Sequence, residues 1–116
     1  MIGMGGISMG NPIQREAIEL FGKNIKESLS SNIKDVRLFG SVARGTDTPE
    51  SDIDILVLVE KDDRDISDAI MDIVVDINLE YDVVITPIII TDSHYTNPLF
   101  RETAFFHNLE YEGVPI

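Results

Sequence analysis

Apolar residues recur at helical spacing in two long segments of the chain, and these segments predict its main helices. Asn11 and Pro12 supply an N-cap and a first helical residue, and Gln14 stands where a capping box carries Glu or Gln. The apolar positions of this first helix are Ile13, Ala17, Leu20, Phe21, Ile25 and Leu29. The acidic stretch 62–65 begins the second helix, whose apolar positions are Ile66, Ala69, Ile70, Ile73, Val74 and Ile77. Both patterns are typical of amphipathic helices that bury one face.

Three shorter segments have the composition of strands, and they cover residues 35–40, 52–59 and 83–90. The second segment alternates, because side chains of a strand leave it on opposite faces in turn. One face is predicted to carry Ile53, Ile55, Val57 and Val59, and the other Asp52, Asp54, Leu56 and Leu58. Pro87 cannot donate a ladder hydrogen bond, so the third strand is expected to bulge there or to run along an edge.

The C-terminal part of the chain begins with Asn97–Pro98, which repeats the first capping pattern and predicts a last helix to about residue 108. Gly113 is expected to end that helix region, and 114–116 to form a short extra strand. The element order is therefore α-β-β-α-β-α. A tight link between the first two strands and one crossover helix predict an α/β fold with a mixed β-sheet flanked by helices.

Length and charge limit the classes of function. The 116 residues suit one small domain over 11–116, after a flexible segment 1–10 that lacks the pattern of a signal peptide. A formal net charge of −12 argues against binding to nucleic acid, which depends on phosphate contacts from Lys and Arg. The chain contains no cysteine, and its apolar runs are shorter than the roughly 20 residues of a membrane span. We therefore expect a cytoplasmic protein without a membrane contact.

Two acids interrupt the apolar strand 52–59, and their spacing suggests a metal site. Asp52 and Asp54 are two residues apart, so their side chains leave the same face with Cα atoms about 6.6 Å apart. Unpaired acids on a half-buried strand are costly, and a hard divalent cation such as Mg²⁺ removes that cost. Gly40 ends the preceding strand, and residues 41–44 can start a helical turn whose backbone N–H groups, together with the Ser41 hydroxyl, suit a phosphate. Together the two motifs predict a site for a metal–triphosphate.

The joined motif LFGSVARGTDTPESDIDILV resembles the signature of the DNA polymerase beta-like nucleotidyltransferase superfamily. The length and layout resemble its minimal nucleotidyltransferase (MNT) branch, whose members are usually encoded beside a HEPN-domain partner. The resemblance implies the nucleotidyltransferase fold, similar to the polymerase beta palm. It also implies transfer of a nucleoside monophosphate, AMP above all, from an NTP such as ATP to an acceptor hydroxyl, with release of pyrophosphate.

The resemblance also implies roles for individual residues. Asp52 and Asp54 would hold Mg²⁺, two ions in all, while Gly40 and Ser41 would hold the triphosphate. A third acid of the family, on the strand after the crossover helix, matches Asp82. Two alternatives to this match stay open, because Asp82 also suits a turn at the end of a strand and the neighbouring Glu80 is a second acid. Arg44 would contact the triphosphate or the acceptor, or else pair with the nearby surface acids Asp47 or Glu50.

The identity of the acceptor is open on the sequence alone. The resemblance points to a tyrosine of a HEPN toxin, and the chain would then be an antitoxin that modifies its partner. The alternative is an antitoxin or binding module that neutralises a partner by complex formation without catalysis. In either case we expect another chain, a second copy or a helical partner, to complete the acceptor site. The histidines and the aromatic residues of 100–111 are better explained by surface positions and core packing than by ligand binding.

Overall fold

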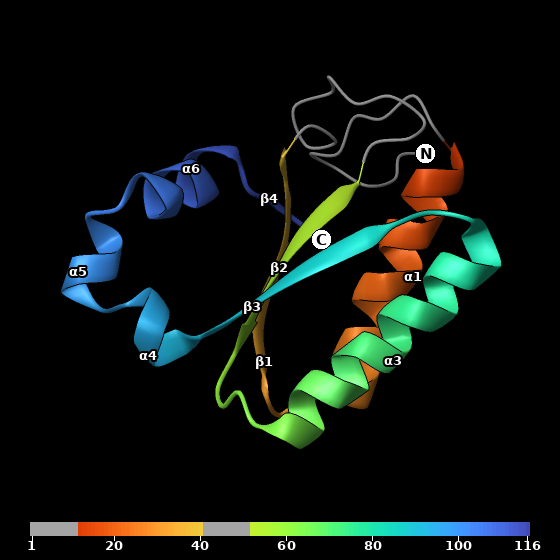
Figure 1. The fold of residues 1–116 in the computed structure, drawn as a ribbon, viewed down its shortest axis with the longest axis horizontal. Coiled ribbons are helices and arrows are strands. Elements are labelled where there is room, and N and C mark those ends of the chain that lie inside the picture. The colour runs from red at the N-terminus through yellow and green to blue at the C-terminus, as the bar shows by residue number, and fades with distance from the viewer. Residues whose placement is uncertain (1–11, 41–51) are drawn as a thin grey trace.

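The computed structural model describes residues 12–40 and 52–116, whose strands form one mixed sheet in the order β3-β2-β1-β4 (Figure 1). The strands are β1 (Ile33–Phe39), β2 (Ile53–Val59), β3 (Ile85–Thr91) and β4 (Val114–Pro115). Strand β1 runs antiparallel to both β2 and β4, whereas β3 runs parallel to β2. The mixed sheet and the short fourth strand confirm the fold predicted from the sequence.

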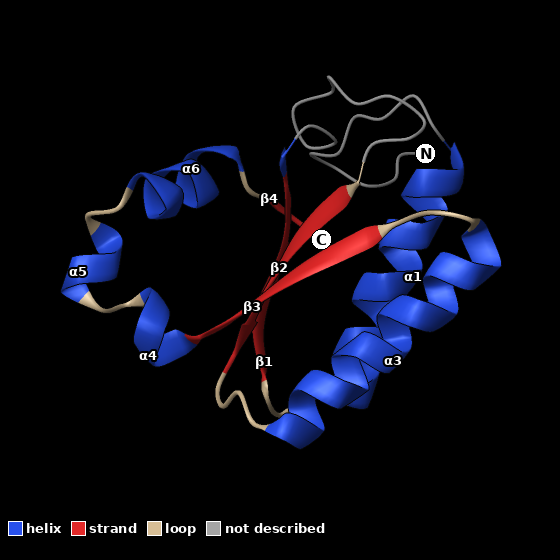
Figure 2. Ribbon diagram, in the orientation of Figure 1, coloured by secondary structure: helices blue, strands red, loops and turns tan. Residues whose placement is uncertain are grey.

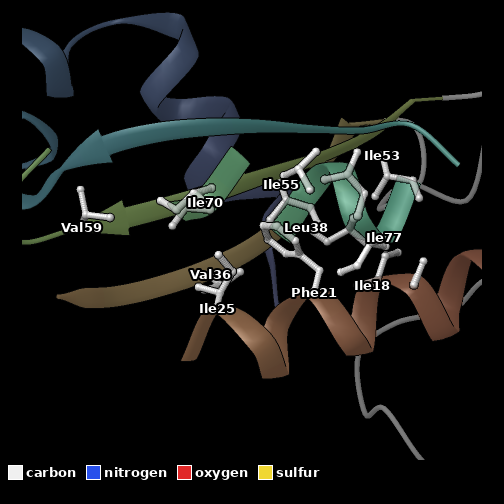
Figure 3. Close-up of a cluster of buried hydrophobic side chains, with 14 residues drawn as sticks. Ile18, Phe21, Ile25, Val36, Leu38, Ile53, Ile55, Val59, Ile70 and Ile77 are labelled. Carbon is white, nitrogen blue, oxygen red and sulfur yellow. The ribbon is translucent and has the colours of Figure 1, made fainter. Parts of the chain in front are cut away.

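Two long helices cover one face of the sheet, α1 (Pro12–Ser28) and α3 (Arg64–Tyr81), which lie side by side (Figures 1 and 2). Their apolar stripes meet the inward-facing residues of β1 and β2 in the larger buried cluster (Figure 3). The largest of its fully buried side chains are Phe21, Ile18, Ile25, Leu38, Ile53, Ile55, Ile70 and Ile77. This cluster forms because both helices bury one face, as their periodicity predicts.

Three short helices cover part of the other face: α4 (Asp92–Tyr95), α5 (Pro98–Arg101) and α6 (Ala104–Glu112) (Figure 2). A second buried cluster lies here, formed by Leu56, Leu58, Ile90, Tyr95, Phe106 and Leu109. Leu56 and Leu58 therefore lie on the opposite side of β2 from Ile55 and Val57. The alternation predicted for this strand is confirmed, and Asp54 has the parity of the second face.

The last helix predicted from Pro98 to about residue 108 begins where expected but is divided, because Thr103 begins a new helix within it, and a further short helix precedes it. Thr91 accepts from the N–H of His94, Asn97 from that of Leu99, and Thr103 from that of Phe106. These hydroxyl and amide groups satisfy N–H groups that have no partner inside a helix. The segment therefore bends at each cap and follows the sheet instead of running straight. None of the helices within 12–40 and 52–116 has the length and apolar character needed to cross a membrane.

A polar cluster fastens the short helices to β1. Arg37 on β1 donates through Nε to Asp35, at 2.7 Å, and through Nη1 to Glu110 on α6, at 2.9 Å. The hydroxyl of Tyr95 on α4 donates to the same carboxylate of Glu110. Burial and the hydrogen bond to Glu110 raise the pKa of Tyr95 to about 12, while the Tyr95 hydroxyl and Arg37 lower the pKa of Glu110. The cluster thus links two of the short helices to the sheet.

We predict that this cluster makes stability fall at alkaline pH. The pKa of Tyr95 is raised in the folded state, so its contribution is complete below the unfolded value near 10 and is lost as pH rises toward 12. Tyr95→Phe has no phenol to ionise, so its free energy of unfolding should fall less across this range in urea titrations. Tyr111→Phe is the matched control, since Tyr111 is 92% exposed. Equal pH dependence for the wild type and Tyr95→Phe would contradict this prediction.

The larger buried cluster predicts a second effect on stability. Ile55 is fully buried on β2, and Ile55→Ala should lower the free energy of unfolding by about 2–5 kcal/mol through lost contacts and a cavity. Leu79 is an exposed apolar residue of α3, so Leu79→Ala should change the free energy of unfolding by no more than about 0.5 kcal/mol. Urea denaturation of the two variants measures both values, and a similar small effect at both positions would mean that the cluster is loosely packed.

Candidate functional site

Asp54 lies at the edge of the second sheet face, beyond the part that the short helices cover. It is half-buried on β2, between Phe39 of β1 and Thr86 of β3, which are its direct neighbours in the two ladders. Asp52 immediately precedes β2 and is exposed, as is Thr86. This is the end of the sheet where β1 finishes and both β2 and β3 begin (Figure 1). The fold therefore places both predicted acids where a ligand can reach them.

Gly40 contacts Asp54 so closely that no side chain fits between them. A Cβ atom built on Gly40 would lie 2.3 Å from Oδ2 of Asp54 and 3.2 Å from its Cγ. Gly40 also has a φ of +78°, a conformation that residues with a side chain rarely adopt. The residue after β1 must therefore be glycine for two reasons, and one of them is to leave the Asp54 carboxylate in place. The sequence suggested only that glycine would allow a phosphate to approach.

Asp82 does not lie on β3, and this corrects its expected position. It is the C-cap of α3, with φ 54° and ψ 49°, and its backbone N–H donates to the carbonyl of Asn78. Strand β3 begins three residues later, at Ile85, after a helix that runs further than its apolar stripe indicated. The turn interpretation of Asp82 thus matches its conformation, and Glu80 lies in the last turn of the same helix. A role of Asp82 in metal binding stays a prediction.

The structure gives little information on the positions of the other residues predicted for the site. Ser41 and Arg44 lie outside the residues that the structure describes. Within 12–40 and 52–116, no three histidine or acidic side chains form a group that would hold a metal ion. Asp52, Asp54 and Asp82 therefore do not gather into the three-acid cluster that the family resemblance implied.

The donor set at this end of the sheet nevertheless suits a divalent cation. Asp52 and Asp54 offer carboxylate oxygens, and the neighbouring Thr86 offers a hydroxyl oxygen, whereas Mg²⁺ is bound through oxygen ligands alone. Gly40 limits the positions open to the Asp54 carboxylate, which favours a defined metal position. The oxygen groups present at this end of the sheet therefore fit Mg²⁺.

Comparison with known proteins decides the family. A model of the nucleotidyltransferase domain matches residues 22–108, which include β1, β2 and β3. The chain belongs to the nucleotidyltransferase family. Two proteins of Methanocaldococcus jannaschii, both named "Putative protein adenylyltransferase", are 34% and 36% identical to it over 100 and 102 residues. These matches cover 86% and 87% of the chain and 94% and 96% of the relatives, so the protein is an enzyme that transfers nucleotides.

Solved structures agree with this assignment at the level of the fold. A "putative minimal nucleotidyltransferase" superimposes with a TM-score of 0.60 at 18% identity, over 92% of this chain and 98% of that one. A toxin–antitoxin crystal structure with AMP-PNP gives a TM-score of 0.52 at 21% identity, over 88% of this chain and 70% of that one. The chain therefore shares its fold with these structures, and the family match confirms the nucleotidyltransferase that the joined glycine–serine and aspartate motif predicted.

Two residues of the site had no signal of their own in the sequence. Thr86 lies in a segment rich in β-branched residues, where threonine is common. Phe39 resembles any other apolar residue of a strand. Their closeness to Asp54 follows from the register of the sheet, with β1 antiparallel and β3 parallel to β2. Counting ladder positions from Asp54 would have found both residues only after the strand order was known.

The contact between Gly40 and Asp54 leads to a prediction for nucleotidyl transfer. Gly40→Ala should lower the transfer rate by about 100-fold, because its Cβ displaces the Asp54 carboxylate and misplacement of a reacting group by about 1 Å costs that much. The positive φ should lower stability by only about 1–2 kcal/mol, so the variant still folds. Labelled-nucleotide transfer and a thermal melt measure the two effects.

Gly22→Ala is the matched control for this substitution. A Cβ atom on Gly22 would lie 2.8 Å from Cγ2 of Ile116, on the face of the sheet that α1 and α3 cover and away from Asp52 and Asp54. This variant introduces a steric clash in the core but does not contact Asp54. Its transfer rate should therefore stay close to that of the wild type. A wild-type rate in Gly40→Ala would show that Gly40 does not position Asp54.

Proposed function

We propose that this nucleotidyltransferase moves AMP from Mg²⁺–ATP to a hydroxyl group of a partner protein. The observation that carries the proposal is the Asp54 carboxylate packed on Gly40 at the accessible end of the sheet, with Asp52 two residues before it. AMP as the transferred group is supported by the relatives named protein adenylyltransferases and by the structural neighbour that contains AMP-PNP. Such a reaction belongs in the cytoplasm, where ATP is available.

The reaction is an in-line displacement at the α-phosphorus of ATP. The acceptor oxygen forms a bond to this phosphorus, the bond to the bridging oxygen breaks, pyrophosphate leaves, and the hydroxyl proton passes to a base or to water. Asp52 and Asp54 would hold Mg²⁺, which when bound stabilises negative charge on the attacking and leaving oxygens. Two ions would serve this chemistry. Gly40, Ser41 and Arg44 are proposed to contact the triphosphate.

The acceptor is proposed to be a tyrosine of a helical toxin of the HEPN class. Two neighbours in structure are toxin–antitoxin complexes, which supports a partner of this kind. After β3 the described chain forms three helices of four to nine residues and the two-residue strand β4, and the helices pack on the sheet instead of enclosing an acceptor. A second chain, the toxin or another copy of this protein, would therefore complete the acceptor site.

A surface of α3 supports the alternative in which the protein neutralises its partner by binding alone. Met71, Val75 and Leu79 follow one another at four-residue spacing and are 43%, 49% and 79% exposed. Asp72 and Asp76 lie exposed on the same helix, so the stripe is bordered by acids. A partner with a basic and apolar surface would fit there. Binding and modification are compatible, and the next experiment separates them.

Transfer from α-labelled ATP tests the proposal. The protein is incubated with Mg²⁺ and with a purified HEPN-domain partner, beside Asp52→Asn and Asp54→Asn. Each substitution should lower transfer by at least about 100-fold, because it removes a ligand of a group that contributes several kcal/mol to the transition state. Glu102→Gln is the matched control, since Glu102 is an exposed acid at the end of α5, outside both the acids of the site and the surface of α3, and should leave the rate unchanged.

The outcomes separate the two functions. A label on the partner that depends on Asp52 and Asp54 supports adenylyl transfer, and its loss in a tyrosine-to-phenylalanine partner identifies the acceptor. Neutralisation of the partner without any label, equal in the wild type and in the aspartate variants, would overturn the catalytic proposal and favour binding. In that case Leu79→Asp should weaken the complex.

A further inference from the structure

Thr86 is the residue of β3 that lies next to Asp54 in the sheet. It is the direct partner of Asp54 in the parallel ladder between β2 and β3. Side chains at paired positions of neighbouring strands leave the same face of a sheet, and the strands are about 4.8 Å apart. Thr86 therefore lies beside Asp54 on the face where the carboxylate lies, and its side chain is exposed.

The hydroxyl of Thr86 is used differently from those of the other described threonines. Thr91 and Thr103 accept from helix N–H groups as N-caps, and Thr96 donates to the carbonyl of Asp92. These three hydroxyls have structural tasks at helix ends. Thr86 caps no helix, and it lies within a strand directly beside Asp54 in the ladder. Its hydroxyl therefore has no helix end to cap.

Asp82 is held away from this position by its surroundings. Its own N–H and that of Val83 both donate to the carbonyl of Asn78, and Oδ1 of Asn78 accepts from the N–H of Ile85 at 3.0 Å. One residue of α3 therefore fixes both the left-handed turn and the start of β3. To replace Thr86 beside Asp54, Asp82 would have to move four residues along the chain, which breaks the register of β3.

We propose that the hydroxyl oxygen of Thr86 binds the divalent cation held by Asp52 and Asp54, in place of a third carboxylate. This inference rests on the metal-dependent transfer proposed above and specifies its ligand set. Hydroxyl groups of Ser and Thr are known ligands of Mg²⁺ in phosphate-binding loops. A neutral hydroxyl leaves the site with one negative charge fewer than three acids would give. Metal affinity without nucleotide should therefore be lower, and the triphosphate should supply the missing charge.

Binding of Mn²⁺, measured by the electron paramagnetic resonance of the free ion in the absence of nucleotide, tests the proposal without an activity assay. Thr86→Val keeps the shape and strand preference of the side chain but removes the oxygen, and it should weaken binding by about tenfold. Thr86→Ser restores the oxygen and should bind within about twofold of the wild type. Thr86→Asp adds a charged ligand and should tighten binding by about tenfold or more.

Leu99→Asp controls for charge alone. Leu99 is 78% exposed on α5, away from the start of β3 (Figure 1), so this substitution adds the same charge at a remote place. Screening at physiological salt should limit its effect on Mn²⁺ affinity to about twofold or less. A thermal melt of every variant shows that the fold is kept. Tighter binding in Thr86→Asp but not in Leu99→Asp supports a direct ligand.

Asp54→Asn makes failure of this inference distinguishable from failure of the proposed function. Loss of Mn²⁺ binding in Asp54→Asn, with wild-type affinity in Thr86→Val, would overturn the role of Thr86 and leave the metal site on the acids. Equal Mn²⁺ affinity in the wild type and in Asp54→Asn, with or without AMP-PNP, would overturn both proposals. Weaker binding in both Asp54→Asn and Thr86→Val, with rescue by Thr86→Ser, is the expected result.

Discussion

The close contact between Gly40 and Asp54 is the constraint on which the site depends. It joins the end of β1 to the start of β2, the two strands whose antiparallel ladder forms the centre of the sheet. The carboxylate can stay half-buried there only because the facing residue has no side chain. The same residue has a positive φ, so the chain leaves β1 in a direction that most residues cannot adopt. Gly40 therefore determines both the local backbone geometry and the position of the Asp54 carboxylate.

The two faces of the sheet differ in how completely they are buried. This difference explains why the fold tolerates Asp52 and Asp54 on one of them. The face under α1 and α3 is apolar along the whole length of β2, where Ile53, Ile55, Val57 and Val59 are all buried. The other face is apolar only from Leu56 onward, where the short helices cover it. Most of the stabilising burial thus comes from the first face. The end of this face that the described helices do not cover carries polar groups at little cost to the fold, since Asp52 and Thr86 are exposed and Asp54 is only half-buried.

The sequence predicted the strands and the two long helices well, and it failed where contacts between distant residues determine the structure. The alternation of β2 and the edge position of Pro87 follow from local chemistry, and both are confirmed. The extension of α3 to Tyr81 could not be predicted from its apolar stripe, which ends at Ile77, because the side chain and carbonyl of Asn78 organise the turn that follows. The place of Asp82 was therefore misjudged, and the neighbourhood of Thr86 appeared only with the ladder.

The free edge of β3 has a consequence for how other proteins can associate with this one. The carbonyl of Val84 accepts from Ile53 of β2, so residues 85, 87 and 89 turn their backbone groups to the open side. Of these, Ile85 gives its N–H to Asn78, and Pro87 has none. An incoming strand would thus lack donors at two successive sites, which blocks sheet extension and the aggregation that follows from it. Partners must recognise side chains instead of backbone at this edge.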